Sequence, residues 1–206
     1  ANDAYALRFA SSKCDVLRVD ARGNVYPLSE GEAEVTVNLG ALTATTTVTV
    51  LGPEDAPVLV FAHGYGTDQS TWRSIAETFA DEYRVVLFDY VGSGASDLSS
   101  YDAQRYDSLS GYAQDLIEVI DAVGATDVLL VAHSVSGMIS ALASIERPEL
   151  FKKILMVCPS PRYVDDGDYV GGFSRDDVLG LIAGIEANHP AACGKALCAR
   201  RVSQRR

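Results

Sequence analysis

From residue 57 onward, short apolar runs alternate with segments in which apolar residues recur at helical spacing. The apolar runs are continuous rather than alternating, which is typical of strands that are buried on both faces of a parallel sheet. This alternation of strands and helices predicts βαβ units and a doubly wound α/β sheet. The predicted strands are Val58–Ala62, Val85–Phe88, Val128–Ala132 and Ile154–Cys158, and the predicted helices are Ser70–Ala80, Leu109–Val123 and Val135–Glu146.

Residues 1–51 follow a different pattern, with the period of two that strands with one buried face show. Apolar and polar residues alternate from 32 to 39, and β-branched residues dominate from 43 to 50. A Pro/Gly/acid break at 52–57 follows. We therefore predict a small all-β domain over 1–51, an exposed linker over 52–57, and part of an α/β domain over 58–190. The alternative is that these strands are the leading antiparallel strands of the α/β domain itself.

The chain carries a net charge of −11 at a sequence pI of about 4.6. Such an acidic surface repels phosphate backbones, so we expect no nucleic-acid partner. No run of eighteen apolar residues is present, so we expect no membrane partner either. The cations concentrate at the end of the chain, where Lys195 to Arg206 holds five of them and no acid. We interpret 191–206 as an unstructured basic tail without a function of its own.

The four cysteines do not have the spacing of a zinc site or of a disulfide framework. They are Cys14, Cys158, Cys193 and Cys198. Cys158 ends an apolar run, which predicts a buried thiol. We expect neither a metal nor another cofactor.

The candidate chemistry centres on Ser134, which follows the predicted strand 128–132 and precedes a predicted helix. Small residues, Ala132 and Ser136, lie two positions away on either side. This small–x–Ser–x–small pattern is typical of a nucleophile elbow, in which a strained strand-to-helix turn exposes the serine hydroxyl. The alternative is an ordinary helix N-cap, since serine is a preferred capping residue.

An activated serine that attacks an acyl carbon creates an oxyanion, which requires N–H donors already in place. At an elbow, one donor is the N–H of the next residue, here Val135. We assign the second to the N–H of Tyr65, in the loop after the first strand of the parallel sheet. Gly64 and Gly66 flank Tyr65 and let this backbone turn inward without a Cβ clash.

His63 and His133 are candidate bases for Ser134, but we favour a supporting role for both. His63 begins the oxyanion loop and is expected to brace it through hydrogen bonds. His133 directly precedes the serine, so its side chain should leave the turn in a different direction. Asp89 with Gly92 and Gly94 does not have the spacing of a nucleotide-binding loop.

With these motifs in hand, residues 58 to about 190 resemble the α/β-hydrolase superfamily. More narrowly they resemble the branch that holds the RsbQ-type bacterial stress regulators and the plant strigolactone and karrikin receptors. The motifs that carry the resemblance are 63–72, 84–94, 132–136, 142–151, 159–163 and 171–173. Short motifs at 11–12, 19–20, 23–25, 31–33, 35–37 and 48–50 similarly resemble a bacterial Ig-like domain of group 2.

The resemblance implies Ser134 as nucleophile, an oxyanion hole from Tyr65 and Val135, and a helical lid that begins near Gly172. It also implies a catalytic Asp and His later in the chain. The sequence departs from the family here, because 189–206 is basic and contains no apolar strand. We therefore interpret the chain as the amino-terminal part of a hydrolase, which alone should not turn over esters.

Three hypotheses of function follow. The first is a serine hydrolase with esterase-like acyl hydrolysis of a small apolar ester or lactone-like ligand. The second is a ligand-sensing or stress-signalling regulator on the same fold, with a regulatory protein partner. The third is a surface protein with a decayed hydrolase. Whether the chain is an enzyme stays open, as does its location: cytoplasmic if the hydrolase part governs, exported if the Ig-like part governs.

Overall fold

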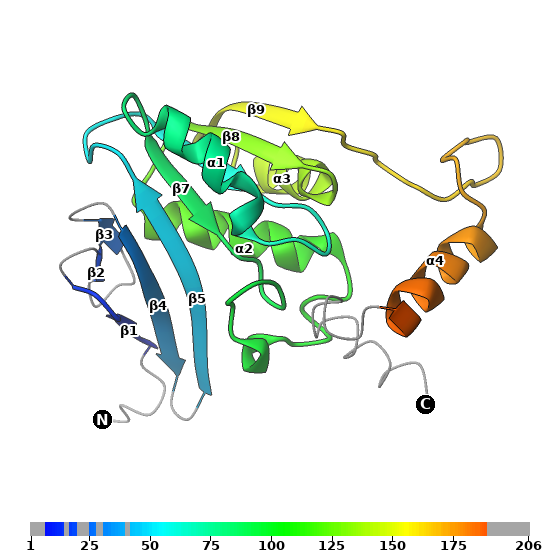
Figure 1. Ribbon diagram of the computed structural model, residues 1–206, viewed down its shortest axis with the longest axis horizontal. Helices are drawn as coiled ribbons and strands as arrows, with labels where there is room; N and C mark the ends of the chain where they lie inside the picture. The colour runs from blue at the N-terminus through cyan, green and yellow to red at the C-terminus, as the bar shows by residue number, and fades with distance from the viewer. Residues whose placement is uncertain (1–6, 15–16, 20–24, 28–30, 40–41, 189–206) are drawn as a thin grey trace.

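Seven strands form one mixed sheet in the order β1-β4-β5-β7-β6-β8-β9, and β2 and β3 pair separately. The computed structural model describes residues 7–14, 17–19, 25–27, 31–39 and 42–188 (Figure 1). The strands are β1 Leu7–Ser11, β2 Leu17–Val19, β3 Val25–Pro27, β4 Gly31–Leu39, β5 Leu42–Leu51, β6 Val58–Ala62, β7 Arg84–Phe88, β8 Val128–His133 and β9 Phe151–Val157. The helices are η2 Gln69–Trp72, α1 Arg73–Ala76, η3 Glu77–Phe79, η4 Leu98–Ser100, α2 Leu109–Ala122, α3 Val135–Glu146, η5 Pro148–Leu150 and α4 Arg175–Asn188.

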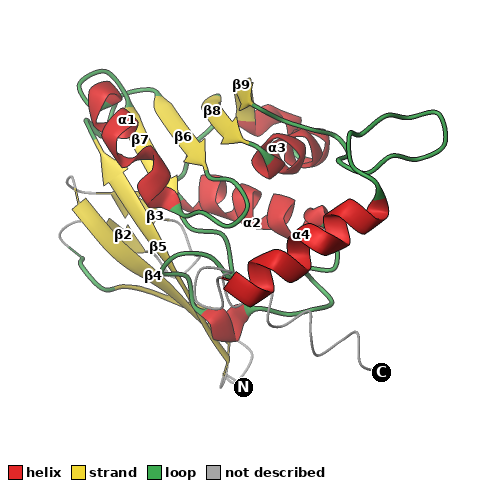
Figure 2. Ribbon diagram, turned by 45° about the vertical axis from the view of Figure 1, so that its right-hand side comes forward, coloured by secondary structure: helices red, strands yellow, loops and turns green. Residues whose placement is uncertain are grey.

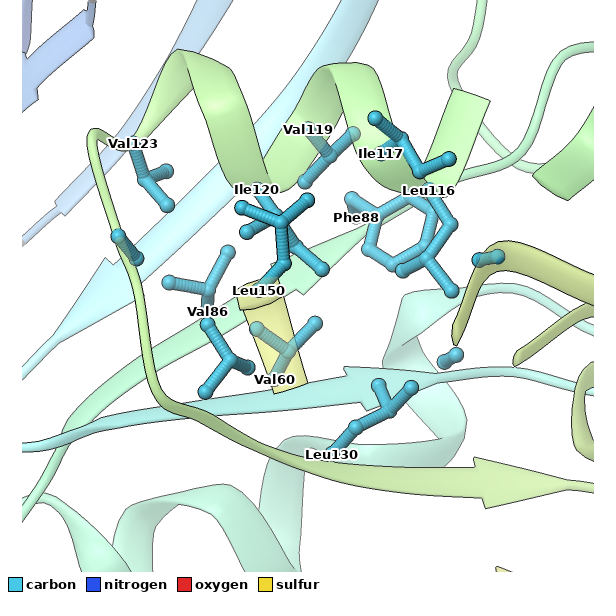
Figure 3. Close-up of a cluster of buried hydrophobic side chains, with 14 of the residues drawn as sticks. Val60, Val86, Phe88, Leu116, Ile117, Val119, Ile120, Val123, Leu130 and Leu150 are labelled. Carbon is cyan, nitrogen blue, oxygen red and sulfur yellow. The ribbon is translucent and has the colours of Figure 1, made fainter. Parts of the chain in front are cut away.

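The central strands β7, β6, β8 and β9 run parallel, as the continuous apolar runs predict. Helices cover both faces of this part of the sheet (Figure 2). On one face the strand side chains pack against α2 and α3, and Figure 3 shows Val60, Val86 and Leu130 meeting Leu116 and Ile120 of α2. On the other face, a smaller cluster joins β6 and β7 to the η2–α1 segment. The α/β fold is therefore confirmed, in a sheet that is mixed rather than wholly parallel.

The division into two separate units stays a prediction, but β5 joins the sheet of the parallel strands. β5 pairs antiparallel with β7, so that Val48 lies opposite Phe88 and Val50 opposite Val86. Both valines are buried in the same core cluster as the parallel strands. The stretch 52–57 is largely exposed and connects two strands of one sheet, β5 and β6. The alternative, that these strands lead into the α/β sheet, describes the observed pairing.

Three further expectations are wrong in detail. The predicted helix 70–80 is broken into η2, α1 and η3, each of four residues or fewer. The predicted strand 154–158 is β9, which begins earlier, at Phe151, ends at Val157 and contains no fully buried residue. Cys158, beyond its end, is an exposed free thiol and not a buried one. The predicted basic tail, 191–206, lies outside the described residues.

The last described helix, α4, lies away from the sheet (Figure 1). A hairpin-like loop precedes it, closed by the bridges Val164–Phe173 and Asp166–Tyr169. The Asp165 carboxylate accepts hydrogen bonds from the N–H groups of Gly171 and Gly172, at 2.8 and 2.9 Å. These contacts fix the shape of the loop that leads from β9 towards the predicted lid.

Candidate functional site

Strand register brings the two predicted site loops together. β6 and β8 are neighbours in the sheet, and Ala62 pairs with Ala132. The chain leaves β6 to form β7 on one side and then returns to form β8 on the other, so this is a switch point of the sheet. In open α/β sheets, ligands bind beyond the carboxyl ends of strands at such a point. Because each loop begins just after the paired alanines, His63–Gly66 lies next to Ser134.

Ser134 has a positive φ, with φ 56° and ψ −119°, between β8 and α3. Positive φ is unusual for a residue with a side chain and marks local strain, as the elbow hypothesis predicts. The residue occupies the N-cap position of α3, but its side chain makes no capping hydrogen bond. Its N–H donates to Val157 O at 2.8 Å, which anchors the turn to β9. The N-cap alternative therefore does not describe this serine.

Gly64 lies in close contact with this turn. A Cβ atom on Gly64 would lie 2.6 Å from His133 Nδ1 and 3.3 Å from Ser134 Cβ. A side chain there would push the loop away from the serine. Gly66, with φ 74°, supplies the left-handed turn that the loop needs next. Between these glycines the Tyr65 side chain is 61% exposed.

His63 is buried and braced at both ring nitrogens. Its Nε2 accepts a hydrogen bond from Tyr90 N–H at 3.2 Å, and its Nδ1 lies 2.9 Å from Gly64 O. Since an amide N–H can only donate and a carbonyl can only accept, the ring is the neutral Nδ1–H tautomer. Burial lowers the pKa of His63, which agrees with a neutral ring. Neither nitrogen is left to take a proton from Ser134.

The His133 ring packs edge-on against Trp72, with centroids 6.2 Å apart. Its Nδ1 is buried and has no hydrogen-bond partner among the described residues. The side chain of Ser134 forms a hydrogen bond with Tyr163, whose Oη lies 3.3 Å from Ser134 Oγ. Tyr163 belongs to the motif 159–163, but nothing in its spacing along the chain links it to Ser134.

A model of the alpha/beta hydrolase family matches residues 59–202, which is well over half of the chain. The chain belongs to the α/β hydrolase family. A model of the bacterial Ig-like domain matches residues 6–51, as the sequence motifs of that segment suggest.

Curated relatives of this α/β hydrolase include plant receptors and esterases. A karrikin insensitive 2 receptor of Petunia hybrida is 41% identical over 155 residues, 75% of this chain and 57% of the relative. A strigolactone esterase of Arabidopsis thaliana is 43% identical over 144 residues, 70% of this chain and 54% of the relative. The chain thus spans about half the length of the curated relatives that it matches.

Among solved structures, a hydrolase from Oleispira antarctica superimposes with a TM-score of 0.65 at 39% identity. The match covers 70% of this chain and 53% of that one. An esterase from Exiguobacterium antarcticum has a TM-score of 0.64 at 23% identity, which supports the fold.

The loop after β7 is organised around Asp89. The carboxylate accepts hydrogen bonds from Gln69 N–H at 2.8 Å, from Gln69 Nε2 at 3.1 Å and from Ala95 N–H at 3.0 Å. Gln69 Oε1 in turn accepts a hydrogen bond from Thr49 of β5 at 2.7 Å. In this α/β hydrolase, β5 is therefore linked to the loops beside the site.

Within the described ranges, no cluster of three or more His, Cys, Asp or Glu side chains could hold a metal ion. Among the helices that the structure describes, none is both long and apolar enough to cross a membrane.

Proposed function

We propose that this α/β hydrolase uses Ser134 as the nucleophile of an esterase-like acyl-transfer reaction. The observation that carries the proposal is the positive φ of Ser134, which holds its hydroxyl out of the capping position and beside Gly64. In the proposed reaction, Ser134 Oγ bonds to the acyl carbon of the substrate. The alcohol then leaves and water cleaves the acyl-serine.

The proposed oxyanion hole consists of the N–H groups of Val135 and Tyr65. Val135 is the first residue of α3, where the N–H groups have no partner within the helix and the helix dipole favours negative charge. Tyr65 lies in the glycine-flanked loop that the β6–β8 register brings to Ser134. His63, Gly64, Gly66 and His133 are proposed to support this arrangement.

The proton of Ser134 requires a base, and His63 is an unsuitable one because both of its ring nitrogens are engaged. We therefore propose that the base is a histidine outside the described residues, as the family resemblance implies. With no base in reach, oxyanion and binding effects would leave a rate only about 10³–10⁴ above that of the uncatalysed reaction in water, about 10⁶ below that of a full triad.

A small apolar ester or lactone is the proposed ligand class. Aromatic side chains lie around Ser134, with Tyr163 at hydrogen-bond distance and Tyr65 in the adjacent loop. Both are partly exposed and can present an apolar face and a hydroxyl to a ligand. The names of the relatives, a strigolactone esterase and a karrikin receptor, point to ligands of this general kind.

The test is covalent labelling of the full chain with a p-nitrophenyl phosphonate, read by intact mass and peptide mapping. We expect one adduct, on Ser134, that Ser134→Ala removes. Ser140→Ala, which removes a buried hydroxyl elsewhere on α3, should label as the wild type does. Absence of an adduct at Ser134, or an equal adduct in Ser134→Ala, would refute a nucleophilic role.

Ligand sensing is the second candidate, and the Ser134–Tyr163 hydrogen bond favours it. This pairing holds the serine hydroxyl without a base, which suits reversible binding of a ligand better than turnover. A butenolide lactone should then raise the Tm of the wild type and of Ser134→Ala equally, with no change in mass. A mass increase in the wild type alone would favour the hydrolase instead. A regulatory protein partner belongs to this second candidate.

A further inference from the structure

A second serine lies two residues after the nucleophile, where the elbow pattern requires a small residue. Ser136 is fully buried, and its Oγ donates a hydrogen bond to His63 O at 2.5 Å. This bond crosses from the first turn of α3 to the first residue of the oxyanion loop, 73 positions earlier in the chain. A glycine would also leave enough space between the strand and the helix. The contribution of the Ser136 hydroxyl is therefore the hydrogen bond and not its small size.

The donor and the acceptor in each contact of the Ser136 hydroxyl can be assigned from the protons that the groups carry. Ser136 Oγ also lies 3.2 Å from Tyr90 Oη. A serine hydroxyl has a single proton, and the His63 carbonyl can only accept it. The Tyr90 hydroxyl is therefore the donor to Ser136 Oγ. Burial raises the pKa of Tyr90, so that its phenol keeps the proton that this bond requires.

His63 is held by three hydrogen bonds, one from α3, one from the loop after β7 and one within its own loop. Its carbonyl accepts from Ser136, its Nε2 accepts from the backbone of Tyr90, and its Nδ1–H donates to Gly64 O. The Tyr90 side chain also packs edge-on against the His63 ring, with centroids 5.1 Å apart. The loop residue next to Gly64 and Tyr65 is thus tied to the helix that begins beside Ser134.

We infer that Ser136 is a positioning residue, whose hydroxyl fixes the oxyanion loop at a set distance from the N-terminus of α3. The inference rests on the proposed function, since it concerns the spacing between the N–H groups of Tyr65 and Val135. Ser136 acts through His63 and does not touch the reacting atoms. Without its hydroxyl, the His63 carbonyl loses a donor in a buried position, while the hydrogen bonds of the His63 ring remain.

The experiment compares two buried serines of one helix in the full chain. Ser136→Ala removes the bond that crosses to the loop, whereas Ser140→Ala removes a bond to Gly137 O within α3. Amide hydrogen exchange of the peptide that contains residues 63–67 is measured for both by mass spectrometry. We expect exchange to rise about tenfold in Ser136→Ala, as the loss of one hydrogen bond would give, and to stay unchanged in Ser140→Ala.

Unchanged loop exchange in Ser136→Ala, or an equal rise in both variants, would overturn the inference. If Ser136→Ala does not fold, Ser136→Gly provides the same comparison with a residue that the elbow accepts. The wild type gives a test without any variant, because the protected Ser136 hydroxyl proton should give an NMR signal with a nuclear Overhauser effect to the Tyr90 ring. Absence of that signal would count against the bond.

Phosphonate labelling of the same variants separates this inference from the proposed function. Slower labelling of Ser134 in Ser136→Ala than in Ser140→Ala would support both. No labelling in the wild type would refute the nucleophilic role of Ser134, while the exchange result would still decide whether Ser136 holds the loop.

Discussion

The strands on the two sides of the central sheet, β5 and β9, are buried to different degrees. The strand with the smaller share of apolar residues, β5, is the more deeply buried one. β5 is rich in threonine, yet Val48 and Val50 are buried in the core that β7 and α2 complete. β9 is more apolar, but Leu155 is 61% exposed, and no described strand pairs with its outer edge. The comparison teaches that neighbours, and not composition, decide whether a strand is interior to this sheet.

The largest effect should come from a charge on the β5 flank. Val50→Asp places a carboxylate opposite Val86, within the buried hydrophobic cluster. An unpaired buried charge costs about 3–5 kcal/mol, so urea unfolding should show a severely destabilised or unfolded chain. If the parallel strands kept the wild-type transition, residues 7–51 would be a separate unit and the comparison would fail.

The free energy of unfolding should depend on pH through Asp115 of α2, the helix that packs on the core shared with β5. Burial raises the pKa of this carboxyl to about 6 from 3.8, and the nearby Arg105 opposes the rise without cancelling it. Arg105 Nη2 lies 2.8 Å from Asp115 Oδ1, which also accepts from Tyr106 Oη at 3.0 Å. Oδ2 is buried without a partner among the described residues, and Glu118, also near Arg105, adds to the rise.

The sign of the effect follows because the folded pKa lies above the unfolded one. The contribution of protonated Asp115 is complete below about pH 4 and is lost as the pH rises through about 6. The free energy of unfolding should therefore fall by at most about 3 kcal/mol across that window, and Asp115→Asn should remove this part of the profile. Asp121→Asn, an exposed change on the same helix, controls for net charge. Identical profiles for wild type and Asp115→Asn would contradict the prediction.

On the β8–β9 flank, the strained turn should give an effect of opposite sign. Ser134→Gly removes the side chain from a residue with φ 56°, so the free energy of unfolding should rise by about 1 kcal/mol. Ser144→Gly, in the interior of α3, should lower it by a similar amount. Thermal unfolding followed by circular dichroism measures both. A decrease in both variants would show that the Ser134 backbone is not strained.

The smallest effect should come from Leu155→Asp on β9, the counterpart of Val50→Asp on β5. Leu155→Asp introduces the same carboxylate on the exposed β9, where it stays in contact with water. We expect a change in the free energy of unfolding within about 0.5 kcal/mol, together with less self-association, since charge on a strand edge opposes edge pairing. A loss of stability comparable to that of Val50→Asp would mean that β9 is covered.

Much of the parallel sheet could be predicted from the sequence, because continuous apolar runs and helical periodicity depend on burial by near neighbours. The starts of β6, β8 and α3 agree with the prediction to the residue. The pairing of β5 with β7 could not be predicted. A period of two shows that one face of a strand is buried, but it does not show which strand pairs with it or which element covers that face. The exposure of β9 was missed for the same reason.

For the site, the sequence could predict the strained serine and the adjacent loop, because both depend on local patterns and on the meeting of strand ends. The two hydrogen bonds that flank the site could not be predicted. Tyr163 reaches Ser134 through the path of the loop after β9, and the Ser136 hydroxyl reaches His63 through the packing of α3 on β6. Neither hydrogen bond corresponds to a fixed separation of residues along the chain that a sequence pattern could reveal.

The pairing of Ala62 with Ala132 has a consequence for the transfer of this site to another scaffold. The two loops owe their proximity to an offset between adjacent strands, and the closest approach is between main chain at Gly64 and side chains at 133–134. A host with two neighbouring parallel strands in the same offset could accept a glycine beyond one strand and a serine beyond the other. Transfer of this site to another protein therefore depends first on the alignment of two neighbouring strands, and only then on the residues placed beyond their ends.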